Sequence, residues 1–250
     1  MKAAVIHENG GPDVLRFEDV PDPECPDGCA LIDVEAISIE GGDLLARAGS
    51  PPPSVPHIVG YLAAGTVVEI GGGVEDRAVG DRVVTLNMAG SHASKRAVPT
   101  MSTWMIPDGL DAAPAACLPV AFGTAQECLF TAGNLEAGQT VLIHAGAGGV
   151  GMAAIQLAKQ AGATVISTAS SDEKLERLKE FGLDNGINYA SENFVERTRE
   201  LTDGRGADVI LDSVGGQNLV DSIGALAYRG TFVSVGVAGR CGPEGPHLRC

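Results

Sequence analysis

The sequence predicts an α/β protein with two main parts and a short tail. Residues 1–119 contain short β-branched runs such as "ALIDVEAISI" and "DRVVTL", separated by Gly, Pro and Asp, which is typical of a β-rich barrel or sandwich. Between residues 120 and 239, strand patterns alternate with helical patterns, which predicts a doubly wound parallel sheet. Residues 240–250, "RCGPEGPHLRC", have neither period and are expected to be irregular.

The second part is predicted element by element from its hydrophobic periodicity and turn residues. Gly162 stands where a helix would end in the left-handed C′ position. The expected elements are helix 124–133, strand 140–144, helix 151–161, strand 164–168, helix 172–181, strand 187–189, helix 193–202, strand 208–212, helix 217–226 and strand 231–235.

Composition excludes several classes of function. The chain has 250 residues, a formal net charge of -15 and 44% hydrophobic residues. No basic patch is evident that could neutralise phosphates, so neither nucleic acid nor an anionic membrane surface is an expected partner. The N-terminus lacks a signal-like apolar run, and the longest apolar stretch, 112–122, is interrupted by Pro114 and Pro119. These observations predict a cytoplasmic protein.

The stretch "HAGAGGVG" contains G-x-G-x-x-G at Gly146, Gly148 and Gly151. It follows a predicted strand and opens a predicted helix, which is the context that dinucleotide binding requires. Gly146 would allow the tight turn, Gly148 the approach of a pyrophosphate, and Gly151 close packing of helix on strand. Gly149 and Val150 complete the candidate cradle, whose helix N-terminus offers free N–H groups. The alternative is a tight β–α turn without a ligand.

The residues after the second strand favour NADPH over NADH. Sites for NAD place an acid about 20 residues after the glycines, at the end of that strand, but Ala169 stands there. Ser170 and Lys174 follow and could hold a 2′-phosphate. Alternatively, Ser170 and Glu173 form a capping box for the next helix.

The six cysteines predict free thiols rather than a metal site. Cys25 and Cys29 have a tolerable metal spacing, but no second Cys or His pair matches them. No metal is therefore expected.

Several motifs in order resemble the zinc-independent quinone oxidoreductase branch of the medium-chain dehydrogenase/reductase superfamily. They include "AISIEGGDLLARAG", "VPHIVGYLAAGTVVEIG", "AGAGGVGMAAIQLAKQAGATVISTASSDEK" and "DSVGG", and the resemblance spans about residues 1–239. It implies a GroES-like catalytic domain at 1–119, a Rossmann-type NADPH domain at 120–239, and an active site in the cleft between them. Zinc-dependent relatives have Gly-His-Glu where this chain has Gly60, Tyr61 and Leu62, and a Cys ligand where it has Glu40. The chain also departs from the quinone reductases, which usually have Asn at Glu40 and an acid at Leu62.

The resemblance implies hydride transfer from NADPH to a quinone or an α,β-unsaturated carbonyl without zinc. Such acceptors spread the incoming charge over a conjugated oxyanion, which hydrogen bonds can stabilise. Tyr61 takes the place of a zinc-binding His, and we expect its hydroxyl to donate to the substrate oxygen; a buried or rim aromatic is the alternative. Asp43 matches a position that lines the active site in the family, and we expect Arg47 to pair with it on a helical turn.

The resemblance also assigns further cofactor contacts. Thr124 would lie near the nicotinamide amide, although Thr124 and Glu127 also form a capping box. Tyr189 matches an adenosine-side contact. His144 is expected to be a strand-end residue, and His7, His57 and His92 show no catalytic pairing. The remaining candidates lie at carboxyl ends of strands, where doubly wound sheets bind ligands: Val214, Val235, Gly236 and Val237.

Family members continue beyond Gly239 with a sixth strand, which commonly builds a homodimer, and then complete the catalytic domain. The chain as given is therefore expected to be C-terminally truncated relative to the family, with strand 231–235 as an exposed edge. A truncated product, a fragment and a natural short form all remain open. So does a second class of function, an NADPH-binding sensor or interaction protein without turnover.

Overall fold

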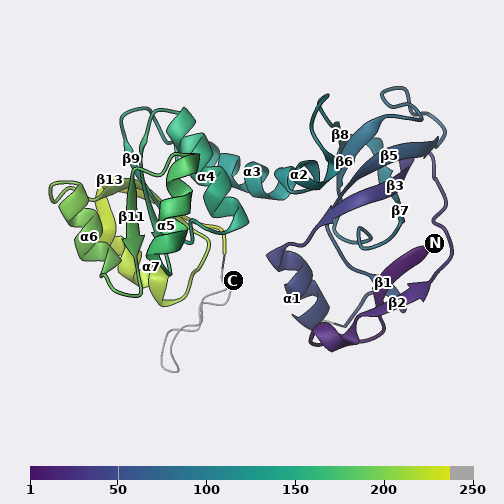
Figure 1. The fold of residues 1–250 in the computed structure, drawn as a ribbon, viewed down its shortest axis with the longest axis horizontal. Coiled ribbons are helices and arrows are strands. Elements are labelled where there is room, and N and C mark those ends of the chain that lie inside the picture. The colour runs from purple at the N-terminus through teal and green to yellow at the C-terminus, as the bar shows by residue number, and fades with distance from the viewer. Residues whose placement is uncertain (50, 237–250) are drawn as a thin grey trace. The chain divides into compact units, whose positions relative to one another are not determined.

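The structure is a computed structural model that describes residues 1–49 and 51–236. The chain forms two compact units, the first from Met1 to Val120 and the second from Ala121 onward. Figure 1 shows the first unit as mostly strands and the second as strands and helices in alternation. The predicted α/β fold class is confirmed, and each unit is described below by itself.

The first unit is built from antiparallel strands. A five-stranded sheet has the order β7-β3-β5-β6-β8, and a three-stranded sheet has the order β2-β1-β4. The strands are β1 (Lys2–Ile6), β2 (Arg16–Asp19), β3 (Cys29–Ser38), β4 (His57–Ile58), β5 (Leu62–Ile70), β6 (Arg82–Leu86), β7 (Lys95–Pro99) and β8 (Thr103–Met105). The helices are α1 (Gly41–Gly49), α2 (Ala112–Ala116) and the 3-10 turns Pro12–Val14 and Thr100–Ser102.

Strand β5 lies unusually close to β3 because Gly65 has no side chain. The register of the two strands shifts between Val34 and Ala36, and a Cβ on Gly65 would lie 2.0 Å from the Asp33 carbonyl oxygen. A glycine inside a strand commonly marks such a bulge or close approach. The core of this sheet is a small aliphatic cluster made of Ala30, Ile32, Val67, Val83 and Val98.

The second unit contains the predicted parallel sheet, with the order β11-β10-β9-β12-β13. Its strands are β9 (Thr140–Ile143), β10 (Thr164–Ala169), β11 (Asn185–Asn188), β12 (Ala207–Asp212) and β13 (Leu226–Ser234). Its helices are α3 (Leu118–Gln126), which begins in the first unit, a π-helical turn (Glu127–Ala132), α4 (Gly149–Gln160), α5 (Asp172–Leu178), α6 (Phe194–Leu201), α7 (Gln217–Ser222) and the 3-10 turns Lys179–Phe181 and Ile223–Ala225.

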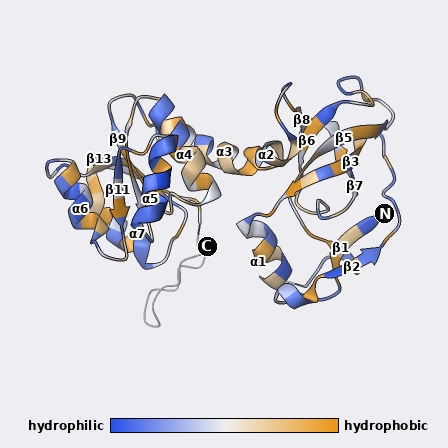
Figure 2. Cartoon of the chain, viewed as in Figure 1, coloured by the Kyte–Doolittle hydropathy of each residue, from blue (hydrophilic) through white to orange (hydrophobic). Residues whose placement is uncertain are grey.

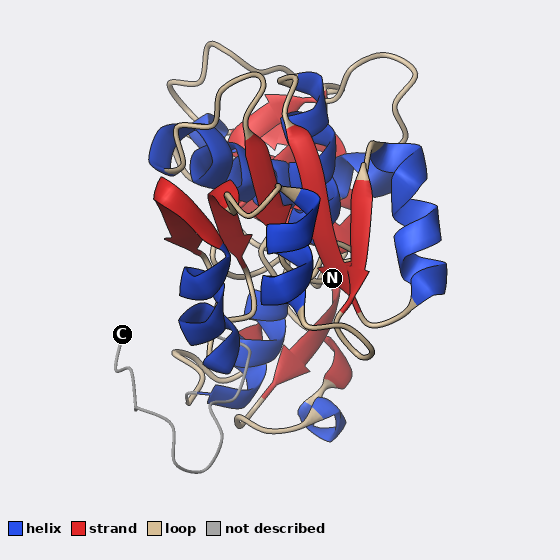
Figure 3. Ribbon diagram, turned by 90° about the vertical axis from the view of Figure 1, so that its left-hand side faces the viewer, coloured by secondary structure: helices blue, strands red, loops and turns tan. Residues whose placement is uncertain are grey.

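Helices cover both faces of this sheet (Figure 3). Alternate residues of the central strands point to opposite faces: Val141 and Ile143 pack with α3, α4 and α5, whereas Leu142 packs with Phe194 of α6. Burial on both faces explains why strands such as "TVLI" are continuously hydrophobic. Helix α5 is largely hydrophilic in Figure 2 apart from its buried Leu175 and Leu178.

Some predicted boundaries were wrong. The helix expected at 124–133 begins at Leu118, because Pro119 is accommodated in its first turn rather than ending it. The helix expected from Gly151 begins at Gly149, after Gly148 as its N-cap. The helix expected at 217–226 is α7 followed by a 3-10 turn, and Leu226 already belongs to β13.

Other local predictions hold. Gly162 follows α4 with a φ of +83°, as a C′ glycine should. Among the described residues, β13 pairs only with β12 and so forms an edge of the sheet. The predicted tail at 240–250 lies outside the described residues.

Candidate functional site

The turn after β9 is shaped by two glycines that protein packing requires. A Cβ on Gly146 would lie 2.0 Å from the Ser167 hydroxyl oxygen, and one on Gly151 would lie 2.4 Å from the Ala145 carbonyl oxygen. Ala145 itself adopts a φ of +54°, a region that residues other than glycine rarely occupy. Side chains at Gly146 and Gly151 would therefore prevent the turn from packing closely on β10 and on helix α4.

Gly148 differs from these two glycines because the protein leaves space beside it. A Cβ there would have as its nearest neighbour the Ala145 carbonyl oxygen at 3.3 Å. Gly148 is the N-cap of the 12-residue helix α4, and Met152 makes the first bond back along the helix, to the Gly148 carbonyl. The N–H groups of Gly149 and Val150 thus have no intrahelical acceptor, and such a helix start attracts anions.

A pocket of about 210 Å³ adjoins this turn. It brings together four predicted cofactor residues, Gly148, Ser170, Lys174 and Tyr189, with Ala145, Ala147 and Ala169. Tyr189 is held there because its backbone N–H donates to the Ala169 carbonyl at 3.1 Å. Residues from three successive loops therefore converge as the sequence predicted.

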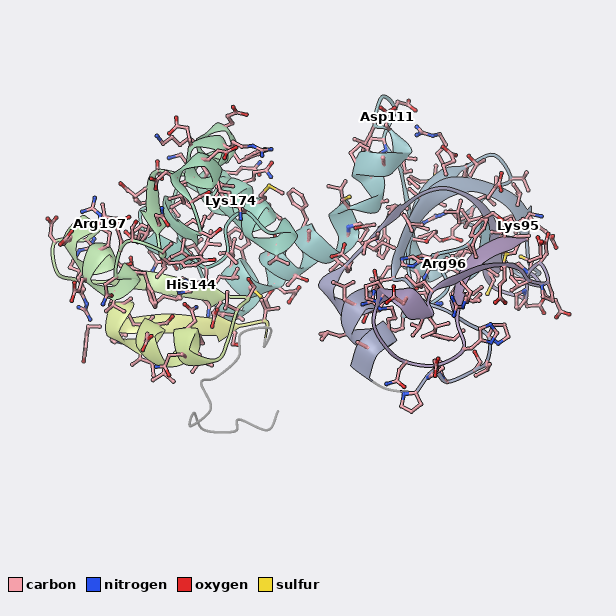
Figure 4. The ribbon with its side chains drawn as sticks, turned by 60° about the horizontal axis from the view of Figure 1, so that its bottom comes forward. Lys95, Arg96, Asp111, His144, Lys174 and Arg197 are labelled. Atoms are coloured by element: carbon pink, nitrogen blue, oxygen red, sulfur yellow. The ribbon has the colours of Figure 1, made fainter. Side chains whose placement is uncertain are left out.

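The charge in this pocket is positive. No carboxylate lines it, and the Lys174 ammonium donates to the Ser170 hydroxyl at 2.9 Å. The nearby Asp172 carboxylate accepts a hydrogen bond from the Asn188 side-chain amide at 2.9 Å. Figure 4 shows Lys174 in the second unit.

The alternative interpretation, in which Ser170 and Glu173 form a capping box, is contradicted. The N-cap of α5 is Ser171, whose hydroxyl accepts from the Lys174 backbone N–H at 3.4 Å. The hydroxyl of Ser170 is therefore free to face the pocket beside Lys174 instead of capping the helix. Of the two neighbouring serines, Ser171 caps the helix and Ser170 lines the pocket.

Thr124 is not a helix cap either. It lies inside α3, since that helix begins at Leu118, and it does not line the pocket. The capping box with Glu127 is therefore wrong. The predicted contact of Thr124 with the nicotinamide amide stays a prediction.

The loops after β12 and β13 contain the remaining candidates. The buried Asp212 carboxylate accepts from the backbone N–H groups of Val214 and Gly215, at 2.9 and 3.1 Å. The Val235 N–H donates to the Asp212 carbonyl, and a Cβ on Gly236 would lie 2.2 Å from the Ser213 carbonyl oxygen. These residues lie at the carboxyl edge of the sheet but do not line the pocket.

Val237, the last candidate of this set, lies outside the described residues.

In the first unit, the structure brings the two predicted catalytic residues together. Asp43 follows Gly42 at the start of α1, and a Cβ on Gly42 would lie 2.4 Å from the Tyr61 ring. The ring of Tyr61 thus packs directly on the backbone next to Asp43. Glycine at position 42 is what permits that contact.

Arg96, which Figure 4 labels in the first unit, fixes the backbone around Tyr61. Arg96 is 3% exposed, and burial lowers the pKa of its guanidinium to about 10, although Asp43 opposes that shift. It donates to the carbonyl oxygens of Tyr61, Asn87 and Ala89 and to the Thr85 hydroxyl, at 2.8 to 3.1 Å. A single side chain therefore ties β5 to the loop after β6.

Asp43 is 2% exposed, and one of its oxygens has no hydrogen-bond partner among the described residues. The other accepts from the Glu40 N–H at 2.8 Å and lies 4.0 Å from the His92 ring. The predicted pairing with Arg47 was wrong, because that guanidinium donates to the Gly10 carbonyl instead. The contact with His92 was missed, since 49 positions separate the two residues.

Asp43 and His92 also line a cavity of about 540 Å³ within the first unit, together with apolar side chains that include Phe17, Ile37 and Leu44. Burial lowers the pKa of His92, while the Asp43 charge opposes that shift. Tyr61 is not among the residues that line this cavity.

Cys25 and Cys29 form a local contact, in which the Cys25 thiol donates to the Cys29 carbonyl. In the described part of the chain, no three His, Cys, Asp or Glu side chains group as a metal ion would require. No helix among those residues is both long and apolar enough to cross a bilayer.

Comparison with known proteins identifies the family. The alcohol dehydrogenase GroES-like domain matches residues 26–129, and the zinc-binding dehydrogenase family matches residues 149–247. The 2-haloacrylate reductase of a Burkholderia species is 39% identical over 243 residues, which cover 94% of this chain and 73% of that protein. The quinone oxidoreductase of Salmonella typhimurium is 36% identical, with 93% and 72% of the two chains covered.

The crystal structure of Escherichia coli quinone oxidoreductase complexed with NADPH has a TM-score of 0.92 and 32% identity, covering 99% of this chain and 76% of that one. This chain spans about three quarters of the length of these three proteins. The chain belongs to the zinc-independent quinone oxidoreductase branch of the medium-chain dehydrogenase/reductase superfamily.

Proposed function

We propose that this protein is an NADPH-dependent oxidoreductase that transfers hydride to a quinone or an α,β-unsaturated carbonyl without zinc. The observation that carries the proposal is the pocket that joins Gly148, Ser170, Lys174 and Tyr189 beside the start of α4. The relatives support it, since they are a quinone oxidoreductase, a 2-haloacrylate reductase and an NADPH complex of a quinone oxidoreductase. Residues 1–119 would be the substrate-binding domain and residues 120–239 the cofactor-binding domain.

The residues present fit NADPH. The space beside Gly148, which the protein does not fill, would admit the diphosphate against the free N–H groups of Gly149 and Val150. Lys174 and the Ser170 hydroxyl would hold the 2′-phosphate. Tyr189 is 55% exposed at the same pocket and offers a face for the adenosine side. Thr124, Val214, Val235, Gly236 and Val237 are proposed for the nicotinamide side.

When bound, NADPH supplies a hydride from its nicotinamide C4. Reduction of a quinone or enone by one hydride leaves negative charge on the substrate oxygen, and one proton completes the reaction. We propose that the Tyr61 hydroxyl donates a hydrogen bond to that oxygen and so stabilises the charge as it develops. Asp43 would line the substrate site next to Tyr61, and Arg96 would hold the Tyr61 backbone in place.

The direct test of the function is NADPH consumption with a panel of acceptors. We expect turnover with 1,4-benzoquinone, 1,2-naphthoquinone or 2-cyclohexenone, no oxidation of simple alcohols with NADP⁺, and rates unchanged after dialysis against a metal chelator, because no metal takes part. Tight NADPH binding without consumption of any acceptor would instead indicate the sensor or interaction protein. A chain that binds no NADPH would contradict both.

A second prediction concerns the choice of nucleotide. Ala169→Asp places a carboxylate in the pocket where the 2′-phosphate is expected, so NADPH should bind at least about tenfold more weakly while NADH binding is kept or improved. Ala169 is 3% exposed, so Ala169→Asn serves as the control of equal size and should change the preference much less. Dissociation constants measured by fluorescence titration decide the matter. A wild type that prefers NADH would refute the assignment.

A third prediction concerns Tyr61. Tyr61→Phe keeps the ring that packs on Gly42 but removes the hydroxyl, so kcat with an enone should fall about tenfold to a hundredfold while NADPH affinity stays the same. Tyr228→Phe makes the same change at a tyrosine that is 94% exposed; it is the matched control and should leave kcat unchanged. If Tyr61→Phe has the kcat and KM of the wild type, Tyr61 plays no part in the mechanism.

A further inference from the structure

The buried imidazole of His144 lies at the centre of the edge of the sheet that carries the cofactor pocket. His144 directly follows the middle strand β9, is 1% exposed, and donates its backbone N–H to the Leu211 carbonyl of β12 at 2.9 Å. Its ring meets the Phe194 ring edge-on with a centroid separation of 4.8 Å. Figure 4 shows His144 inside the second unit. Neither the sequence patterns nor the proposed mechanism gives this side chain a role.

The hydrogen bonds around His144 define its tautomer. The Ser222 hydroxyl donates its one hydrogen to the Asn218 carbonyl at 2.6 Å, so toward the His144 Nε2, at 3.0 Å, it can only accept. Nε2 therefore bears the proton, and Nδ1 of the neutral ring is an acceptor. The Thr168 hydroxyl, 3.2 Å from Nδ1, donates to it.

The Thr168 hydroxyl connects His144 to the glycine turn. While it donates to the imidazole, its oxygen accepts the backbone N–H of Ala145 at 3.3 Å. Ala145 is the turn residue with a φ of +54°, and both Ala145 and Ala169, the neighbour of Thr168, line the pocket. The orientation of the imidazole thus affects the position of two backbone segments, one at Ala145 and one at Thr168 and Ala169, between which the nucleotide would lie.

The other end of the chain of hydrogen bonds reaches the loop after β12. The Asn218 amide donates to the Asp212 carboxylate at 3.0 Å, and the same carboxylate holds the N–H groups of Val214 and Gly215. Hydrogen bonds therefore run from the turn after β9, through His144 and Ser222, to the Asn218 backbone carbonyl, and the side chain of the same Asn218 continues the connection to the loop after β12. His144, Thr168, Ser222 and Asp212 are buried and Asn218 is half-buried, and a largely buried network of this kind favours one arrangement of the groups that it joins.

We propose that His144, as the neutral Nε2–H tautomer, is a positioning residue that holds the loops after β9, β10 and β12 in the geometry that binds NADPH. This inference rests on the proposed function, since NADPH is the ligand whose binding it governs. Burial lowers the pKa of His144 to about 4, although the Asp212 carboxylate opposes the shift, so the ring is neutral near pH 7. The other side chains in contact with it, from Thr168, Ser222 and Phe194, carry no charge.

The test is a double-mutant cycle on NADPH binding with Thr168→Val, which removes the hydroxyl at nearly constant shape, and His144→Leu. Each single variant should raise the NADPH dissociation constant about tenfold. The double variant should raise it by no more than either single one, because both changes break the same link. His144→Asn, whose side-chain oxygen can replace Nδ1 as the acceptor, should retain affinity within about threefold of the wild type.

Thr202→Val is the matched control for general loss of stability. The Thr202 hydroxyl is equally buried and accepts the Gly206 N–H at 2.8 Å before β12 begins, away from the pocket. This variant should lower the urea midpoint as Thr168→Val does, while its NADPH dissociation constant stays that of the wild type.

The two proposals fail in different ways. If the wild type binds NADPH and Thr168→Val and His144→Leu bind it equally well despite lower urea midpoints, His144 is only structural and the inference is wrong. Additive losses of affinity in the cycle, or no rescue by Asn, would also overturn it. If the wild type itself does not bind NADPH, the proposed function is wrong.

Discussion

The close approach of β9, the glycine turn and α4 is the constraint on which the second unit depends. Gly146 permits the turn to pack on the Ser167 side chain of β10, and Gly151 permits α4 to approach the backbone of Ala145 and Gly146. Because of this close packing, the unpaired N–H groups at the start of α4 face the space beside Gly148. Every proposed contact with NADPH is arranged around this point, since the phosphate-binding amides cannot be supplied by a side chain placed elsewhere.

Charge is arranged around that space in a consistent way. The chain has a net charge of -15, yet the pocket beside α4 has Lys174 as its charged side chain and no carboxylate. The Asp172 carboxylate accepts a hydrogen bond from the Asn188 side-chain amide, and the Asp212 carboxylate accepts hydrogen bonds from backbone N–H groups, so neither points its charge at the pocket unpaired. An acidic protein can thus present a local site for a phosphorylated ligand, because the field near the site depends on the nearest charges.

Local sequence signals predicted much of the fold and of the cofactor site. Strand and helix periods indicated the parallel sheet, and the glycine motif in its strand-to-helix context indicated the cradle. Lys174 was predicted from its place at a helix start after the second strand, and Tyr189 from the family resemblance; the structure places both in one pocket. The errors came where two local signals competed. The helix expected from Thr124 begins at Leu118 with Pro119 in its first turn, and the N-cap of α5 is Ser171 rather than the alternative, Ser170.

Long-range contacts could not be predicted in this way. Asp43, in the first turn of α1, lies 4.0 Å from the His92 ring rather than pairing with Arg47, because the fold brings α1 next to the loop that carries His92. His144 joins Thr168 and Ser222 from three segments far apart in the sequence. A buried histidine beside a glycine motif carries no local sign of its partners, so its role became visible only when hydrogen-bond directions could be followed.

The most direct test of the central claim is an NMR titration of the ¹⁵N-labelled chain with NADPH. If the diphosphate binds at the start of α4, the amide signals of Gly148, Gly149, Val150 and Gly151 should shift in a saturable manner, together with those of Ser170 and Lys174. NADH should move the first group while affecting Ser170 and Lys174 much less. Saturable binding that leaves the amides of residues 148–151 unchanged would contradict the account.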